Sequence, residues 1–219
     1  MVTLDMVKNS EEVKTYIEYG NNHLGAIGFT EHSFRHANIV SNIAAYILKE
    51  LNYSQREVEL AAIAGYLHDI GNVVSRHDHG QTGAILSMSI LKELGMDFKE
   101  ISLVAAAIGN HEEEYGQAVN FIASALILAD KSDVHRGRVR NKEAVNFDIH
   151  DRVNFAAEKS EIIVLSKENA IELRLKINTE ICPVMEYFEI FLNRMMMCRK
   201  AADYLNTQFR LNINESRLL

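Results

Sequence analysis

The sequence predicts a mostly α-helical protein with a small β-element near its C-terminus. Only one of the 219 residues is proline and 11 are glycine, so the chain lacks the frequent turns of a many-stranded sheet fold. Apolar residues recur at helical spacing through the N-terminal two thirds and alternate strictly only near the C-terminus. An apolar fraction of 47% and a charged fraction of 24% are typical of a globular domain.

Helical signals are present in most of the chain. Ser54 and Glu57 have the spacing of a capping box, Gly71 is placed as a helix stop, and Pro183 suits a first turn. The predicted helices cover approximately residues 6–19, 31–51, 54–70, 81–94, 97–110, 117–134 and 182–205. Residues 21–30 are predicted to form a loop.

The C-terminal third has a different pattern. Residues 161–165 and 170–177 predict two strands joined by a four-residue turn, and 209–213 alternate again. The expected element is therefore a small antiparallel β-hairpin or three-stranded sheet with a long helix. We expect a helical domain over residues 1–145 and an appendage over 146–219 that packs on it.

Metal-ligating side chains occur at the ends of the predicted helices. They are His32, the pair His68-Asp69, His79, His111 and Asp130. Imidazole and carboxylate groups are ligands for iron, manganese, zinc and similar ions. Asp130 follows an apolar run, 125–129, so it is expected to be buried, and a buried carboxylate needs a partner or a metal.

This order of residues resembles the HD superfamily of metal-dependent phosphohydrolases. The matching segments are His32-Ser-Phe-Arg35, His68-Asp-Ile-Gly71 and Ala129-Asp130, and the resemblance covers about residues 28–140. It implies a helical HD-domain fold. His79-Gly-Gln-Thr-Gly83 and Asn110-His111-Glu112 are similar to segments of members with two metals.

The resemblance implies a ligand set for one or two divalent ions. One ion would take His32, His68, Asp69 and Asp130, and a second would share Asp69 and add His79 and His111. Iron or manganese is expected, with zinc, nickel, cobalt and magnesium as alternatives. His36 competes with His32, Asp133 with Asp130, and His77 with His79 for these positions.

The same resemblance implies hydrolysis of a phosphoester or phosphoanhydride in a nucleotide-like molecule by metal-activated water. Asp69 and Glu112 are the expected catalytic residues, and Lys131, Arg136 and Arg35 the expected phosphate ligands. Asn72 replaces the lysine that follows the motif in members that cleave cyclic dinucleotides, and no Gly-Tyr-Pro segment is present. A di-iron oxygenase and a non-catalytic sensor or scaffold that retains a metal are the alternatives.

Charge and cysteine content narrow the expected partners and compartment. The net charge of −7 argues against a general nucleic-acid surface. The only two cysteines, Cys182 and Cys198, are too far apart on one predicted helix to form a disulfide, and no signal-peptide or membrane-spanning pattern is seen. We therefore expect a cytoplasmic protein that binds a small phosphorylated substrate and no membrane, and the alternating strands could also complete a homodimer.

Overall fold

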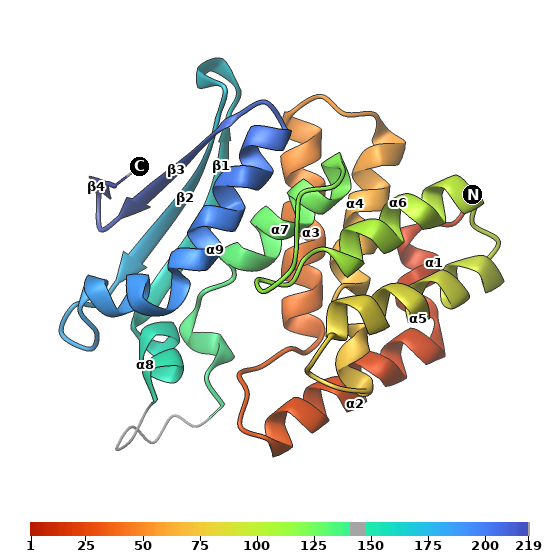
Figure 1. Cartoon of the computed structure of the whole chain (residues 1–219), viewed down its shortest axis with the longest axis horizontal. Coiled ribbons are helices and arrows are strands. Elements are labelled where there is room, and N and C mark those ends of the chain that lie inside the picture. Colours follow the sequence, from red (N-terminus) through yellow and green to blue (C-terminus); the bar gives the residue numbers. More distant parts are fainter. Residues whose placement is uncertain (141–147, 219) are drawn as a thin grey trace.

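The protein is a bundle of helices with a small sheet at one side (Figure 1). The structure is a computed structural model that describes residues 1–140 and 148–218. The predicted fold class is confirmed. The predicted domain boundary at residues 145/146 lies outside the described residues. The elements are α1 Leu4–Asn9, α2 Glu11–Ala26, α3 Phe34–Glu50, α4 Gln55–Leu67, the 3₁₀ turn η1 Ile70–Val73, α5 His79–Glu93, α6 Phe98–Gly109, α7 Phe121–Ser132, the 3₁₀ turn η2 Arg136–Arg138, α8 Ile149–Ala156, β1 Ala157–Leu165, the 3₁₀ turn η3 Ser166–Glu168, β2 Ala170–Ile177, α9 Val184–Tyr204, β3 Gln208–Ile213 and β4 Ser216–Arg217.

Helices α4 and α7 form the centre of the bundle. Every residue of α7 from Ile122 onward is buried, and so is most of α4. Both helices pack against α3. Gly65 permits a close approach of α4 to α3, because a Cβ there would lie 2.8 Å from the Ser41 Cα. The C-terminal ends of α4 and α7 therefore carry their polar residues into the protein interior.

The N-terminal region differs from its prediction. Two helices replace the single helix expected over 6–19, because Ser10 ends α1 and its side chain accepts a hydrogen bond from the Val13 amide at the start of α2. Helix α2 continues to Ala26, through part of the predicted loop. It packs on η1, and a Cβ on Gly20 would lie 3.1 Å from the Val73 nitrogen. This contact supports the segment that follows His68-Asp69.

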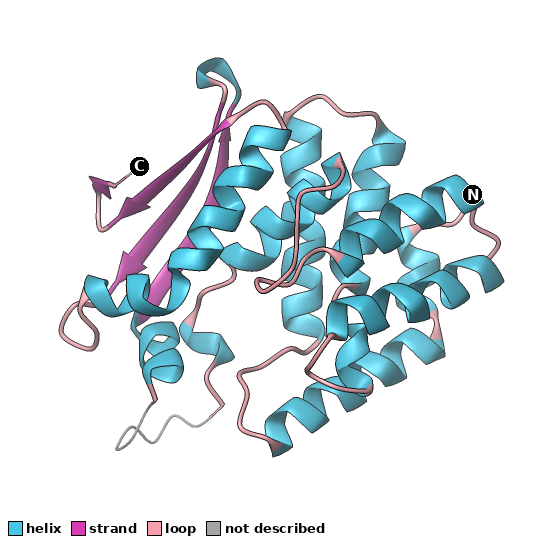
Figure 2. Cartoon of the chain, viewed as in Figure 1, coloured by secondary structure: helices cyan, strands magenta, loops and turns pink. Residues whose placement is uncertain are grey.

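The sheet is mixed, in the order β1-β2-β3-β4 (Figure 2). Strands β1 and β2 form the predicted antiparallel hairpin, but β3 lies parallel to β2. Parallel neighbours need a crossover connection, and α9 provides it. Helix α9 packs against α7, which brings the C-terminal region to the edge of the bundle where α7 ends. Among the described residues no helix is both long and apolar enough to cross a bilayer.

Candidate metal centre

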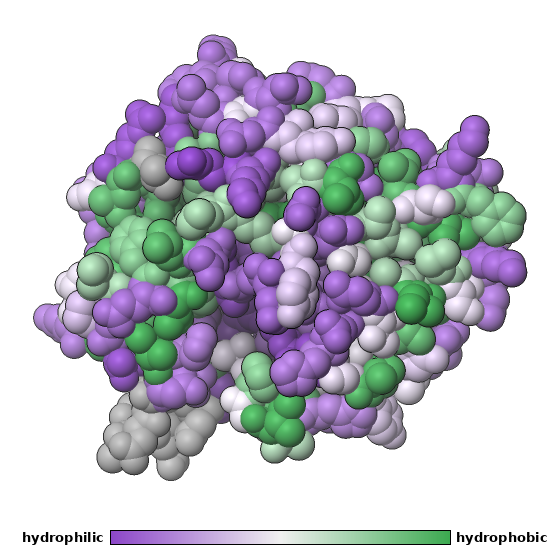
Figure 3. Space-filling model, viewed as in Figure 1, coloured by the Kyte–Doolittle hydropathy of each residue, from purple (hydrophilic) through white to green (hydrophobic). Residues whose placement is uncertain are grey.

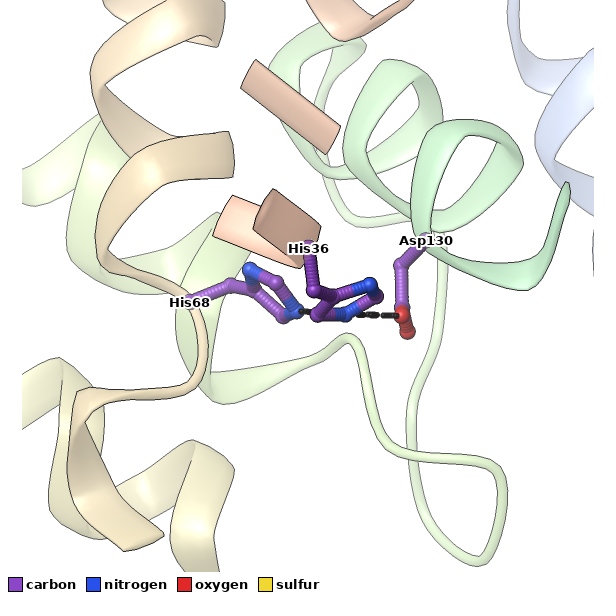
Figure 4. Close-up of side chains that lie close together, drawn as sticks. All are labelled: His36, His68 and Asp130. Carbon is purple, nitrogen blue, oxygen red and sulfur yellow. Dashed lines mark hydrogen bonds and ion pairs between the residues drawn. The ribbon is translucent and has the colours of Figure 1, made fainter. Parts of the chain in front are cut away.

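Histidine and aspartate side chains from several helix ends meet at one place in the bundle. His36 lies in the first turn of α3, His68 and Asp69 directly follow α4, and Asp130 is in the last turn of α7. Figure 4 shows His36, His68 and Asp130 pointing toward one another from these three helices. His79 begins α5 and His111 follows α6, and both point to the same centre.

One group of ligand atoms lies between α3, α4 and α7. The Nε2 atom of His36 is 3.2 Å from the Nε2 of His68 and 3.3 Å from the Oδ1 of Asp130. The Oδ2 of Asp69 is 3.5 Å from the Nε2 of His36 and 3.3 Å from the Nε2 of His68. Ligand atoms about 2.1 Å from a shared ion at tetrahedral angles lie about 3.4 Å apart, so these separations suit one metal ion.

A second group lies beside the first and shares Asp69. The Nε2 atoms of His79 and His111 are 3.1 Å apart. Both face the other oxygen of Asp69, because Oδ1 is 3.3 Å from His79 Nε2 and 3.9 Å from His111 Nε2. Asp69 therefore presents one oxygen to each group, the arrangement of a carboxylate that bridges two ions.

The hydrogen bonds of three histidines leave Nε2 available as a ligand. The Nδ1–H of His68, His79 and His111 each donates to the carbonyl oxygen three residues earlier, at 2.8, 3.0 and 2.6 Å respectively. A carbonyl only accepts, so in the neutral rings the proton is on Nδ1 and the lone pair is on Nε2. Such outer hydrogen bonds orient metal-ligating imidazoles.

His32 does not join these groups, and His36 takes the position that the sequence assigned to His32. His32 donates from Nδ1 to the Thr30 carbonyl at 2.8 Å and accepts at Nε2 from Arg138 at 2.9 Å. Both ring nitrogens are occupied, so no lone pair remains for an ion. His36 instead donates from Nδ1 to Asp133 Oδ2 at 2.7 Å and turns Nε2 toward His68.

The charges at the centre favour a cation. Although burial raises the pKa of a carboxyl group, His68 holds the pKa of Asp69 well below its usual range, and Lys131 does the same for Asp130. Burial lowers the pKa of His68, but Asp69 and Asp130 outweigh it and raise that pKa to about 10. The carboxylates of Asp69 and Asp130 thus stabilise a positive charge at the Nε2 atom of His68, and either a proton or a divalent ion can supply that charge.

One buried oxygen shows that the residues present fit a metal. Asp69 Oδ2 has no hydrogen-bond partner among the described residues, although it is inaccessible to solvent. An unsatisfied buried charged oxygen is costly, and a divalent cation would satisfy it. The other oxygen and the backbone carbonyl of Asp69 accept from the Asn72 side-chain amide at 3.0 and 2.9 Å, so Asn72 fixes the carboxylate.

The family model described as "HD domain" matches residues 29–156, more than half of the chain. This protein belongs to the HD-domain family. HD-domain proteins form a superfamily of metal-dependent phosphohydrolases that bind divalent metals. The histidine–aspartate groups described above fit such a metal site.

Individual relatives of this HD domain include an archaeal protein and bacterial nucleases. It is 29% identical to protein MJ1020 of Methanocaldococcus jannaschii over 74% of this chain and 71% of that protein. It is 30% identical to ribonuclease Y of Oceanobacillus iheyensis and 29% identical to that of Enterococcus faecalis. In both cases the match covers 65% of this chain and 24% of the nuclease, so the chain spans about a quarter of those relatives.

A cavity of ≈ 450 Å³ opens beside the histidine–aspartate groups of the HD domain. The surface is recessed and hydrophilic near the middle of the face drawn in Figure 3. Glu112 and Lys131 line the cavity. Glu112 Oε1 accepts from the Gly80 amide at 2.5 Å and lies 3.3 Å from His79 Nδ1, and Lys131 Nζ lies 2.7 Å from Asp130 Oδ2. Both residues therefore touch side chains of the centre.

Two of the predicted phosphate ligands do not line this cavity. Arg35 pairs with Glu31 at 2.8 Å and with Asp133 at 3.0 Å. Arg136 lies 3.5 Å from Glu158, and its guanidinium faces the Phe155 ring. Arg35 is therefore held beside Asp133, and Arg136 lies against α8 and β1. Lys131 is the one of the three predicted ligands that the structure places at the cavity.

Three other arginines line the cavity: Arg76, Arg138 and Arg194. Arg76 lies in a polar segment and Arg138 in a basic segment of the sequence, and on sequence grounds both are weaker candidates for phosphate contact than Lys131 and Arg136. Arg194 lies in the middle of α9. No sequence signal links Arg194 to the HD motif, because its position depends on how α9 packs against α7.

Proposed function

We propose that this chain hydrolyses a phosphoester or phosphoanhydride bond in a small, nucleotide-like substrate. The bridging position of Asp69, with one oxygen toward His36 and His68 and the other toward His79 and His111, carries the proposal. Membership of a hydrolytic metal-dependent family supports it.

The proposed ligands are the side chains of both groups around Asp69. The first ion would be held by His36, His68, Asp69 and Asp130, and the second by Asp69, His79 and His111. Iron and manganese are the ions that we favour for this mixture of imidazole and carboxylate. When bound, such ions polarise a phosphoryl oxygen and lower the pKa of a coordinated water.

Glu112 is proposed to accept a proton at the cavity wall. Burial alone would raise the pKa of its carboxyl group, but His79 and the Gly80 amide lower it to about 2. Glu112 is therefore ionised at neutral pH, so it can accept a proton but has none to donate. Lys131, with Nζ beside Asp130, supplies positive charge that would stabilise an anionic phosphoryl group.

A small substrate is favoured over a nucleic-acid strand. The ribonuclease Y relatives make RNA the natural comparison, and the shared HD domain is compatible with a phosphodiester. However, Glu113 and Glu114 line the cavity, and the chain carries a net charge of −7. A strand-binding protein normally has a basic surface that follows the phosphate backbone.

Elemental analysis followed by a phosphoester panel tests the proposal. We expect two metals per chain in the wild type, one in His79→Ala and His111→Ala, and a full complement in the control His23→Ala, an exposed histidine outside both groups. With manganese or ferrous iron, the wild type should cleave a phosphoester, and His68→Ala should not. Full activity in metal-depleted His68→Ala would contradict the proposal, and substrate-dependent oxygen uptake would support the oxygenase alternative.

A further inference from the structure

A second cavity adjoins the one at the metal centre and shares a set of basic side chains with it. The second cavity has a volume of ≈ 420 Å³. His32, Arg76, Arg138 and Arg194 line both cavities. A molecule whose reacting phosphate lies at the metal centre would therefore pass these side chains before it entered the second cavity.

Arg76 and Arg194 present free hydrogen-bond donors at this junction. Arg194 donates from Nε to Glu113 at 2.5 Å, and its two terminal nitrogens donate to no group in residues 1–140 and 148–218. Arg76 has only long contacts from Nη1, at 3.5 Å to Asn72 and 3.4 Å to His79. No carboxylate of the described chain lies within 4 Å of Arg76. Both guanidinium groups are thus incompletely satisfied where they line the cavities.

Each of these two guanidinium groups lies over the face of a phenylalanine ring. The Arg76 guanidinium lies 5.5 Å from the centre of the Phe29 ring, and that of Arg194 lies 4.2 Å from the centre of the Phe191 ring. Both distances are those of cation–π contacts, which use the face of the aromatic ring and consume no N–H donor of the guanidinium. The free N–H donors can therefore bind a phosphate, for which bidentate guanidinium contacts are well suited.

Arg138 adds a third positive charge that cannot move away. It is buried and donates to the carbonyl oxygens of Glu31 and Asp133 and to His32 Nε2, at 3.3, 2.9 and 2.9 Å respectively. Burial lowers the pKa of Arg138, the carboxylates of Asp133, Asp130 and Asp69 oppose this effect, and the positive charge of Arg194 adds to it. An anion at the junction would reduce the repulsion between Arg138 and Arg194.

We propose that Arg76 and Arg194, backed by Arg138, bind a second phosphate group of the substrate. The inference rests on the proposed hydrolytic function and narrows its substrate class to small molecules with two phosphate groups, such as phosphoanhydrides. The first phosphate lies at the histidine–aspartate centre, the second lies at the arginine junction, and the rest of the molecule extends into the second cavity. Arg194 makes the appendage a direct contributor to substrate selection.

Phosphate binding to the metal-free protein tests the arginine junction without relying on catalysis. Without its metals the carboxylate-rich centre repels anions, so saturable binding of inorganic phosphate in calorimetry would report the junction. We expect Arg194→Gln to weaken that binding about tenfold to a hundredfold. Glu113→Gln should strengthen it several-fold, because it frees Arg194 from its ion pair. Arg199→Gln, an exposed arginine on the same helix, is the matched control and should leave it unchanged.

Steady-state kinetics with manganese then test the substrate class. Arg194→Gln should raise KM about tenfold or more for a nucleoside diphosphate and much less for a simple phosphomonoester, while Arg199→Gln should match the wild type with both. Absence of phosphate binding by the metal-free wild type, or equal binding by Arg194→Gln, would overturn the inference while leaving hydrolysis intact. So would tighter binding of a single-stranded oligoribonucleotide than of the diphosphate. Phosphate binding that depends on Arg194 in a protein without phosphohydrolase activity would instead remove the proposed function alone.

Discussion

The Nδ1 atom of His36 donates a hydrogen bond of 2.7 Å to Asp133 Oδ2, and this bond turns the opposite nitrogen of the ring toward His68 and Asp130. Asp133 also pairs with Arg35, at 3.0 Å. A carboxylate behind an imidazole fixes its tautomer and its orientation. Asp133 is therefore a positioning residue for the first ion rather than a rival ligand to Asp130.

Asp133→Asn should weaken metal binding at the first group. An amide that accepts from Nδ1–H keeps the tautomer but loses the negative charge, so we expect affinity to fall about 10- to 100-fold. Competition with a metal indicator measures this affinity directly. Asp203→Asn, at an exposed position on α9, is the control, and an affinity equal to that of the wild type in Asp133→Asn would show that the hydrogen bond has no effect on the ion.

Gly71→Ala should destabilise the fold because η1 and α5 approach too closely for a side chain. A Cβ on Gly71 would lie 2.0 Å from the His79 carbonyl oxygen and 2.6 Å from the Gly83 nitrogen. Both obstacles are backbone, so we expect the free energy of unfolding in urea to fall by more than about 2 kcal/mol.

Gly109→Ala is the matched comparison for this change. Its Cβ would meet only the Ala84 Cβ, at an ordinary 3.6 Å, and alanine suits a helix better than glycine. Its free energy of unfolding should equal or slightly exceed that of the wild type. Both variants are measured in the presence of a metal chelator, so that metal binding does not contribute to stability. Equal free energies of unfolding of the two variants would refute the steric argument.

Glu100→Gln should reduce stability at neutral pH but not in acid. Arg56 donates to Glu100 at 2.7 and 2.6 Å and also holds Glu59 and the Val2 carbonyl. The hydrogen bond from Arg56 lowers the pKa of Glu100, so the folded state binds its proton less tightly than the unfolded state does. The stabilisation is thus fully present above the usual glutamate pKa of about 4.3 and is lost as the pH falls through the lower folded value.

Thermal unfolding over a range of pH checks this sign. The Arg56–Glu100 pair is partly exposed, so at pH 7 the free energy of unfolding of Glu100→Gln should be lower than that of the wild type by no more than about 1 kcal/mol. It should disappear in acid, whereas Glu18→Gln, at an exposed position on α2, should follow the wild type throughout. A difference that grew as the pH fell would contradict the assignment.

Cys198 should resist thiol reagents until the protein unfolds. Burial raises the pKa of its thiol to about 12, so at pH 8 only about one molecule in ten thousand carries the reactive thiolate. In a Cys182→Ser background, we expect labelling by a disulfide reagent to be very slow in the native state and rapid in denaturant. Rapid native labelling would mean that α9 separates readily from α7.

Two residues of the site could not be assigned from the sequence. The spacing of His32 and His36, one helical turn apart, could not decide between them, because the choice depends on Arg138, which occupies His32 from more than a hundred residues away. The role of Arg194 could not be predicted for a related reason, because only the packing of α9 on α7 places this residue at the cavity. In contrast, His68, Asp69, His79, His111 and Asp130 lie together as the motif order predicts, because each is fixed to the end of a helix whose apolar face determines its direction.

The parallel pairing of β2 and β3 limits how Arg194 can vary. Six residue pairs, from Ala170–Gln208 to Leu175–Ile213, tie the two ends of the crossover that contains α9. Helix α9 lies between these two paired strands and packs on α7 and β3, so the sheet and the bundle together set the position of Arg194 relative to Asp130. Insertions in the turns beside α9 should therefore change which substrates fit, even where they touch neither the metal ligands nor the cavity.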